Sequence, residues 1–290
     1  MSVEIITWFD SDGNPHSLSD FPFFGMLRGR QNAFMPPARH IEDRVPMQNG
    51  ARFRNSFFEP RSVDLPFHVE DTDEDVLRAH LRNIMGWFNP YNGDGQLEIA
   101  HGSTVRRLNC RYQDGLGLDE SDQNNGVYWQ DFVLTLRAAD PFWYDVTPAH
   151  VDYSAAGGGT LYFFPILPMQ LITSAVFGTS DIVNSGDVEA WPVWTIDGPT
   201  SGGLVLTNNT SGLTFELSGL VLTLGQTLTI DTRPGHKTIK RDDGSNRMGD
   251  GFSGSMWPLV RGTNNLTVNL GGSDTNSRVQ LDYYQGYLAP

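Results

Sequence analysis

The second half of the chain is dominated by short segments in which apolar and polar residues alternate. Residues 204–207 and 213–217 flank the turn sequence NNTSG, which predicts a hairpin with Leu213, Phe215 and Leu217 facing the core. The alternation recurs at Leu228 and Ile230, at Leu266, Val268 and Leu270, and at Val279, Leu281 and Tyr283. Seven or eight such strands in about 110 residues, with no helical pattern among them, predict a β-sandwich.

The first half contains one convincing helical pattern, which begins after Thr72 or Asp73. Either residue can cap the N-terminus, and acidic residues fill the first turn. Apolar residues then follow with a 3.6-residue period, at Val76, Leu77, Leu81, Ile84, Met85 and Phe88. Gly86 and Pro90 end the pattern. We therefore expect one amphipathic helix that buries this stripe.

Six other segments of the first half favour strands, namely residues 3–9, 53–58, 62–69, 96–100, 104–112 and 128–138. In the last of them, Tyr128, Phe132, Leu134 and Leu136 fall on one face, and Asp131, Thr135 and Arg137 fall on the other. This pattern predicts a half-buried antiparallel strand. The expected fold class is mainly β, with one short α-helix.

Composition changes between the two halves. Cutting after Asp145, glycine divides 11 to 20 and threonine 4 to 17, and an uncharged stretch at residues 153–180 contains the run Gly157-Gly158-Gly159. The apolar part of that stretch is shorter than the roughly 20 residues of a membrane span, so we interpret it as a linker that leads into a buried strand. The expected domains are residues 1–148, a linker and first strand at 149–180, and a β-sandwich at 181–290.

Net charge and cysteine content exclude several classes of protein. With 20 basic and 34 acidic residues the chain carries −14, which argues against a protein that grips nucleic-acid phosphates. Cys110 is the single cysteine, so neither an intrachain disulfide nor a multi-cysteine metal site is available. No basic segment precedes an apolar stretch near Met1, so no secretory signal is expected.

No motif for nucleotide binding or hydrolysis is present. The chain has no P-loop, no GxSxG and no HExxH, and its seven histidines are scattered singly. Acid-rich stretches at residues 71–75, 119–126 and 242–251 invite a calcium interpretation. The first is explained by the preference of a helix N-terminus for negative charge, and the other two lack the EF-hand spacing. We therefore expect no catalytic residue, no cofactor and no metal, while a structural calcium in either loop stays open.

A strand of alternating pattern, VYWQDFVLTLRAADPFWYD, closes the first domain with Asp140, Pro141, Phe142 and Trp143. Residues 182–198 (IVNSGDVEAWPVWTIDG) follow, with Asn184, Gly186 and Asp187, and then TLTIDT at 227–232 and LVRGTNNLTV at 259–268. In this order, the segments resemble those of siphophage distal tail proteins, and the agreement spans nearly the whole chain.

The resemblance implies a structural protein, not an enzyme. It implies a homohexameric ring at the tail tip of a virion, made in the bacterial host cytoplasm, with N-terminal domains between the tail tube protein and the tip hub, and near the tape measure protein. It also implies that galectin-like or carbohydrate-binding-module-like C-terminal sandwiches are displayed outward. Six copies would carry 6 × −14 = −84, and we expect an acidic lumen to let DNA pass without adhering, since like charges repel over about 8 Å at physiological salt.

A carbohydrate-binding module for host surface polysaccharide is the alternative. Aromatic side chains that could stack on sugars are Trp191, Trp194, Trp257, Tyr283, Tyr284 and Tyr287, and Trp191, Trp257 and Tyr284 are the candidates. Large aromatics are usually buried, so most of the six are expected in the core or in a subunit contact. A glycoside hydrolase has no motif in its favour.

Overall fold

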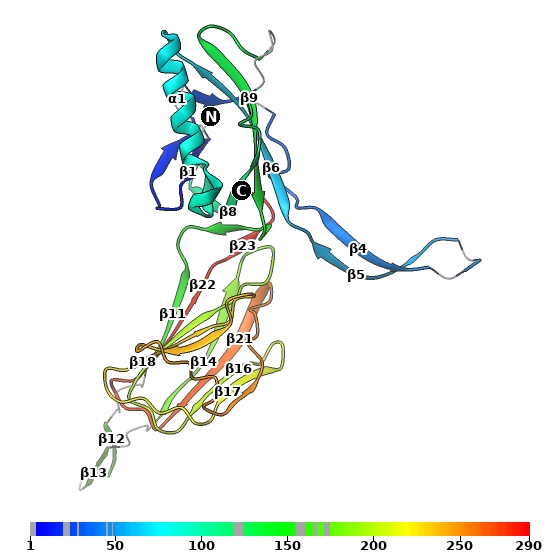
Figure 1. Ribbon diagram of the computed structural model, residues 1–290. Helices are drawn as coiled ribbons and strands as arrows, with labels where there is room; N and C mark the ends of the chain where they lie inside the picture. Colours follow the sequence, from blue (N-terminus) through cyan, green and yellow to red (C-terminus); the bar gives the residue numbers. More distant parts are fainter. Residues whose placement is uncertain are drawn as a thin grey trace. The chain divides into compact units, whose positions relative to one another are not determined.

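The computed structural model describes residues 4–19, 24–27, 29–44, 46–47, 49–118, 124–154, 160–164, 167–170 and 175–290. These residues form two compact units (Figure 1). Unit 1 comprises Met1–Val146 together with Tyr287–Pro290, and unit 2 comprises Thr147–Gly286. The last four residues therefore belong to unit 1, although the sequence analysis assigned them to the second domain.

Unit 1 is built on one large antiparallel sheet, in the order β2-β1-β7-β8-β9-β6-β3. Its strands are β1 (Ile5–Phe9), β2 (Pro15–Ser17), β3 (Phe24–Met26), β6 (Arg61–Glu70), β7 (Gly95–His101), β8 (Thr104–Asp114), β9 (Trp129–Ala138) and the short β10 (Trp143–Asp145). A separate two-stranded hairpin consists of β4 (Ala38–Asp43) and β5 (Arg52–Phe58). β23 (Gly286–Tyr287) pairs with β10.

Helix α1 (Glu74–Trp87) begins at the N-cap Asp73, whose carboxylate accepts hydrogen bonds from the backbone N–H groups of Asp75 and Val76. A 3₁₀ turn, η1 (Pro90–Asn92), follows. Leu77, Ile84 and Phe88 are buried in the core of unit 1, as predicted. Val76 and Met85, which were expected in the same stripe, are exposed, because each lies about 100° around the helix from the buried residue beside it.

The pairing of β6 with β9 provides the central ladder of unit 1. All five odd-numbered residues of β6, including Arg61, are buried, as are Phe132, Leu134 and Leu136 of β9. Tyr128 was predicted on that buried face but is exposed, because β9 starts only at Trp129 and the alternation does not extend beyond the ladder. Cys110 lies in this core, and burial raises the pKa of its thiol to about 12.

Unit 2 is a sandwich of two five-stranded antiparallel sheets, which confirms the predicted architecture. One sheet has the order β11-β22-β15-β18-β19, and the other has the order β14-β21-β16-β17-β20. The strands are β11 (Ala149–Ser154), β14 (Ala175–Asn184), β15 (Val193–Asp197), β16 (Leu204–Asn208), β17 (Leu213–Leu217), β18 (Thr227–Asp231), β19 (Thr238–Arg241), β20 (Phe252–Gly254), β21 (Gly262–Gly271) and β22 (Arg278–Tyr283). A further hairpin pairs β12 (Thr160–Phe164) with β13 (Leu167–Gln170).

The core of the sandwich contains the alternating residues that the sequence singled out. Phe215, Leu217 and all eight residues from Leu228 to Tyr283 named above are buried. Leu213 is exposed instead, because it opens β17 opposite Asn208, where the hairpin turns at the end of the sheet. The glycine run at 157–159 lies outside the described residues.

The edge strand β11 carries a charge cluster that makes the stability of unit 2 depend on pH. His150 lies between two carboxylates, with Nδ1 2.7 Å from Asp282 Oδ1 and Nε2 3.1 Å from Asp152 Oδ2. Hydrogen bonds to Asp282 and then Asp152 raise the pKa of His150 above 6.5. A raised folded-state pKa stabilises the fold below the unfolded pKa, and this contribution is lost as pH rises through the folded value.

We therefore predict that His150→Gln destabilises the protein at pH values below about 6.5 and has progressively less effect as pH rises above the raised pKa. Thermal unfolding of both proteins over a pH series measures the difference. A difference in midpoint that is the same at every pH would show that the charge of His150 contributes nothing.

Candidate assembly interface

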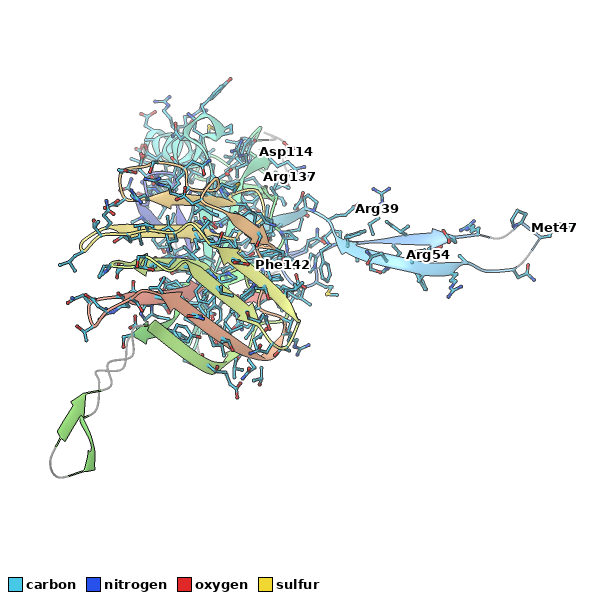
Figure 2. All side chains as sticks on the ribbon, turned by 90° about the horizontal axis from the view of Figure 1, so that it is seen from below. Arg39, Met47, Arg54, Asp114, Arg137 and Phe142 are labelled. Carbon is cyan, nitrogen blue, oxygen red and sulfur yellow. The ribbon has the colours of Figure 1, made fainter. Side chains whose placement is uncertain are left out.

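The β4–β5 hairpin, which we call the arm, leaves the sheet of unit 1 and has no strand partner other than itself within the described residues (Figures 1 and 2). Every residue of both strands is exposed. Figure 2 shows Arg39 and Arg54 along the arm and Met47 at its tip. An isolated two-stranded hairpin is at best marginally stable in water, so the arm needs either a strong root or a partner.

Apolar side chains lie on both faces of the arm. Cross-strand partners share a face, so Ile41, opposite Asn55, and Phe57, opposite Arg39, lie on one face. Phe53, opposite Glu42, lies on the other face, where its ring meets the edge of His40. Phe53 is 67% exposed and Phe57 is 51% exposed. Exposed apolar residues gathered on one element mark an interaction surface, and here both faces qualify.

The root of the arm explains the Asp-Pro-Phe-Trp segment. Trp143 is fully buried, and its Nε1–H donates to the carbonyl of Ala33 at 2.9 Å, just before the chain enters β4. Phe142 packs edge-on against Phe58, the last residue of β5, with ring centroids 5.6 Å apart. Consecutive residues of the motif thus hold the two ends of the arm.

Asp140 and Pro141 fix the shape of this motif. The Asp140 carboxylate accepts hydrogen bonds from the backbone N–H of Phe142 at 3.2 Å and from the hydroxyl of Tyr144 at 2.7 Å. Pro141 is buried, and as a proline it cannot donate to the ladder, so β9 ends before it. The motif is therefore an anchor built by local hydrogen bonds.

Arg61 completes the root and was missed from the sequence. It is fully buried, and its guanidinium donates to the carbonyls of Ala33 at 2.9 Å, Phe34 at 2.7 Å and Leu288 at 3.1 Å. Burial lowers its pKa to about 10, while the charge of Asp140 favours the protonated form, so Arg61 stays charged near neutral pH. The sequence signal that Arg61 is buried was its place in the alternation of β6, two residues before the buried Val63 and on the same face.

The second family-like segment is a structural loop of unit 2. The buried amide of Asn184 donates to the carbonyls of Val188 at 2.8 Å and Leu259 at 3.2 Å, and its oxygen accepts from the N–H of Gly186 at 3.0 Å. A Cβ on Gly186 would lie 2.6 Å from the carbonyl oxygen of Gly286, so only glycine fits. Asp187 contributes its backbone N–H to the same oxygen, at 2.8 Å.

The aromatic candidates for sugar stacking separate clearly. Trp257 is 2% exposed and lies edge-on against Trp194, so it is a core residue and cannot stack on a sugar. Tyr283, also buried, donates its hydroxyl to the carbonyl of Val183. Trp191 is half-buried and faces the ammonium of Lys237, and Tyr284 is 40% exposed.

In the acid-rich stretches, side-chain oxygens accept hydrogen bonds from nearby backbone N–H groups. Asp73 caps α1, and the side chains of Asp243 and Asn246 accept backbone N–H groups of their own loop. No group of three potential metal ligands occurs among the residues that the structure describes. Residues 119–123 of the second stretch lie outside them. Within the same described ranges, no helix has the length and apolar character needed to cross a membrane.

The whole chain is similar to solved phage structures. The SPP1 Dit protein (gp 19.1), described as a paradigm of the hub adsorption apparatus of phages that infect Gram-positive bacteria, superimposes with a TM-score of 0.70 over 98% of this chain and 99% of that one, at 11% identity. This chain has the fold of a siphophage distal tail protein. The baseplate of phage P2 in its activated conformation with Ca gives a TM-score of 0.52 over 97% of this chain and 98% of that one, at 8% identity.

No protein-family model matches the sequence, and no curated protein matches it either. The likeness therefore rests on the fold. The identities of 11% and 8% are too low for a comparison of sequences to find it. The distal tail fold predicted from the order of four short segments is confirmed.

Proposed function

We propose that this protein is a structural component of a bacteriophage tail tip, in which six copies form a ring that connects the tail tube to the tip hub or baseplate. The observation that carries the proposal is the arm, an exposed hairpin with apolar side chains on both faces and a rigid buried root. Its fold neighbours are parts of phage adsorption hubs and baseplates, which supports a structural role and not catalysis.

The arm suits contact with a second copy of the chain. When one surface of a chain contacts a different surface on the next copy, successive copies form a closed ring if the rotation between neighbours divides the circle evenly. An arm with both faces apolar can lie between surfaces of neighbouring subunits and bury Ile41, Phe53 and Phe57 together, at roughly 1.5–3 kcal/mol for each side chain. The carboxylate of Asp43 pairs with Arg54, so these two charges are satisfied within the arm.

The ring would sit at the tail tip of the virion, with the tail tube protein, the tip hub protein and the tape measure protein as partners. Acidic residues outnumber basic residues in the chain, 34 to 20, and a lumen with the same balance would repel DNA during its passage, whereas a basic lumen in a structure of the ring would contradict this expectation.

Electron images and the mass of the purified protein in solution test the proposal. We expect a closed particle with six-fold symmetry. A stable monomer that also fails to bind the tail tube and tip hub proteins of its phage would contradict the assignment.

A further inference from the structure

Residues 287–290, which we call the tail segment, belong to unit 1 and are held there by an arginine of β8. The ring of Tyr287 lies under the guanidinium of Arg106, whose central carbon is 3.5 Å from the ring centroid. The hydroxyl of Tyr287 donates to Asp145 at 3.1 Å, and Nη1 of Arg106 donates to the carbonyl of Ala289 at 2.7 Å. Arg106 therefore holds the tail segment at two points.

A second arginine, Arg61, joins the tail segment to the root of the arm. Its Nη2 donates to the carbonyl of Leu288 at 3.1 Å. Its Nη1 donates to the carbonyls of Ala33 and Phe34, which lie a few residues before β4. The guanidinium is planar and rigid, so one group fixes the tail segment and the arm root relative to each other.

The Arg61 guanidinium cannot lose an acceptor and stay buried. The side chain is fully buried, and its Nε already has no hydrogen-bond partner among the described residues. If the tail segment left its place, Nη2 would lose Leu288 as an acceptor. A buried charged group with unpaired donors is costly, so we expect Arg61 to turn toward water and to release Ala33 and Phe34. The arm root is therefore held only while the tail segment is in place.

The tail segment continues the chain directly from unit 2. Gly286 is the last residue of unit 2, and its carbonyl accepts hydrogen bonds from the backbone N–H groups of Asp187 at 2.8 Å and Val188 at 3.4 Å. One planar peptide bond joins Gly286 to Tyr287, so a movement of Gly286 along the chain displaces Tyr287 as well.

We propose that the tail segment is a latch on the arm: the arm stays in the position that it needs to bind a second copy of the chain only while residues 287–290 are held beside Arg61 and Arg106. This inference rests on the proposed role of the arm in assembly and adds the residues that position the arm. It also gives unit 2 an influence on assembly, because a pull on Gly286 that displaces the tail segment releases Arg61.

Two neighbouring arginines of β8 provide a matched test. Arg106→Met removes the hold on the tail segment and leaves Arg61 unchanged. Arg107→Met is the control, because Arg107 makes the same kinds of contact with other partners, an ion pair with Glu98 at 2.8 Å and a cation–π contact with Phe9 at 4.1 Å. The two arginine side chains are similarly exposed, at 19% and 28%.

Hydrogen–deuterium exchange, followed peptide by peptide by mass spectrometry, reports on the arm root directly. The backbone N–H of Glu59 donates to the carbonyl of Pro37 at 2.8 Å and closes the base of the arm. In monomeric protein we expect Arg106→Met to speed exchange at Glu59 about tenfold or more, since exchange follows the population of the opened state. Exchange in residues 132–136 of β9 should stay unchanged, which shows that unit 1 is folded. Arg107→Met should change neither region.

A further variant tests whether Arg106 acts on the arm root through Arg61. Arg61→Lys keeps the charge, but its single nitrogen cannot hold the tail segment and the arm root together, so exchange at Glu59 should also rise. In the double variant Arg61→Lys/Arg106→Met, the second change should add nothing further, because the connection is already broken. If the two effects on Glu59 multiply, Arg106 acts by another route and the latch is wrong.

The mass of the same proteins in solution measures ring formation. Arg106→Met should need a higher protein concentration to form rings than either the unaltered protein or Arg107→Met. Equal exchange at Glu59 in Arg106→Met and Arg107→Met would overturn the latch, and so would rapid exchange with no effect on ring formation through the arm. The arm itself is tested separately by removing its apolar side chains. If that variant still assembles, the proposed function fails, while exchange at Glu59 still decides whether the tail segment holds the arm root.

Discussion

Serine at three arm positions, Ile41, Phe53 and Phe57, should abolish assembly and leave the fold of unit 1 intact. All three side chains are exposed in the single chain, so their loss costs the monomer little. In an assembly that buries them, each contributes roughly 1.5–3 kcal/mol, and their joint loss weakens subunit association by about a thousandfold or more. Mass measurement of the triple variant should show monomers at concentrations where the unaltered protein forms rings, with an unchanged circular dichroism spectrum.

A matched control comes from unit 2. Val221 and Leu224 are exposed to a similar degree, at 54% and 69%, and the double variant Val221→Ser/Leu224→Ser removes apolar surface that belongs to unit 2 and not to the arm. It should assemble normally. If the arm variant forms rings at the same concentration as the unaltered protein, the arm is not part of the interface.

Trp143→Ala should be the most destabilising single substitution at the root of the arm. The side chain is fully buried, so its removal leaves a large cavity and costs about 3–5 kcal/mol. The carbonyl of Ala33 also loses one of its two side-chain donors and keeps only Arg61. Urea denaturation monitored by circular dichroism measures the loss in the free energy of unfolding of unit 1.

Two further substitutions separate the contributions at this position. Trp143→Phe keeps most of the apolar volume and removes the hydrogen bond to Ala33, so we expect a smaller loss, of about 1–3 kcal/mol. Tyr91→Ala, at a side chain of unit 1 that is 97% exposed, should leave the free energy of unfolding unchanged. A loss at Trp143→Ala no larger than that at Tyr91→Ala would contradict the role of Trp143 as the anchor.

Elements governed by local interactions could be predicted from the sequence. The cap at Asp73, the helix that follows it and the alternating strands of the sandwich all depend on residues within a few positions of one another. Two of the errors fall at the ends of strands. Tyr128 precedes the first residue of β9, and Leu213 opens β17 before the part of that strand that pairs with β20.

The functional surfaces were less accessible to sequence reasoning. Residues 53–58 were predicted as a strand, but nothing local distinguishes a strand inside a sheet from one in an arm that leaves it. Trp191 and Trp257 are chemically equal, and only the contacts around each decide that Trp257 is buried against Trp194 while Trp191 faces Lys237. The Asp140–Trp143 motif was noticed, but its purpose lies in Ala33 and Phe58, about a hundred residues away.

The sequence by itself determined the composition of the two halves, the single helix, the mainly β class and the negative charge, because each is a sum or a short-range pattern of residues. The tertiary structure alone decided which side chains stay exposed, how Arg61 and Trp143 hold the root of the arm, and which of Trp191 and Trp257 is buried. The reason is physical. Burial and pairing depend on strand registers that join distant parts of the chain, and a one-residue shift in register exchanges the buried and exposed faces.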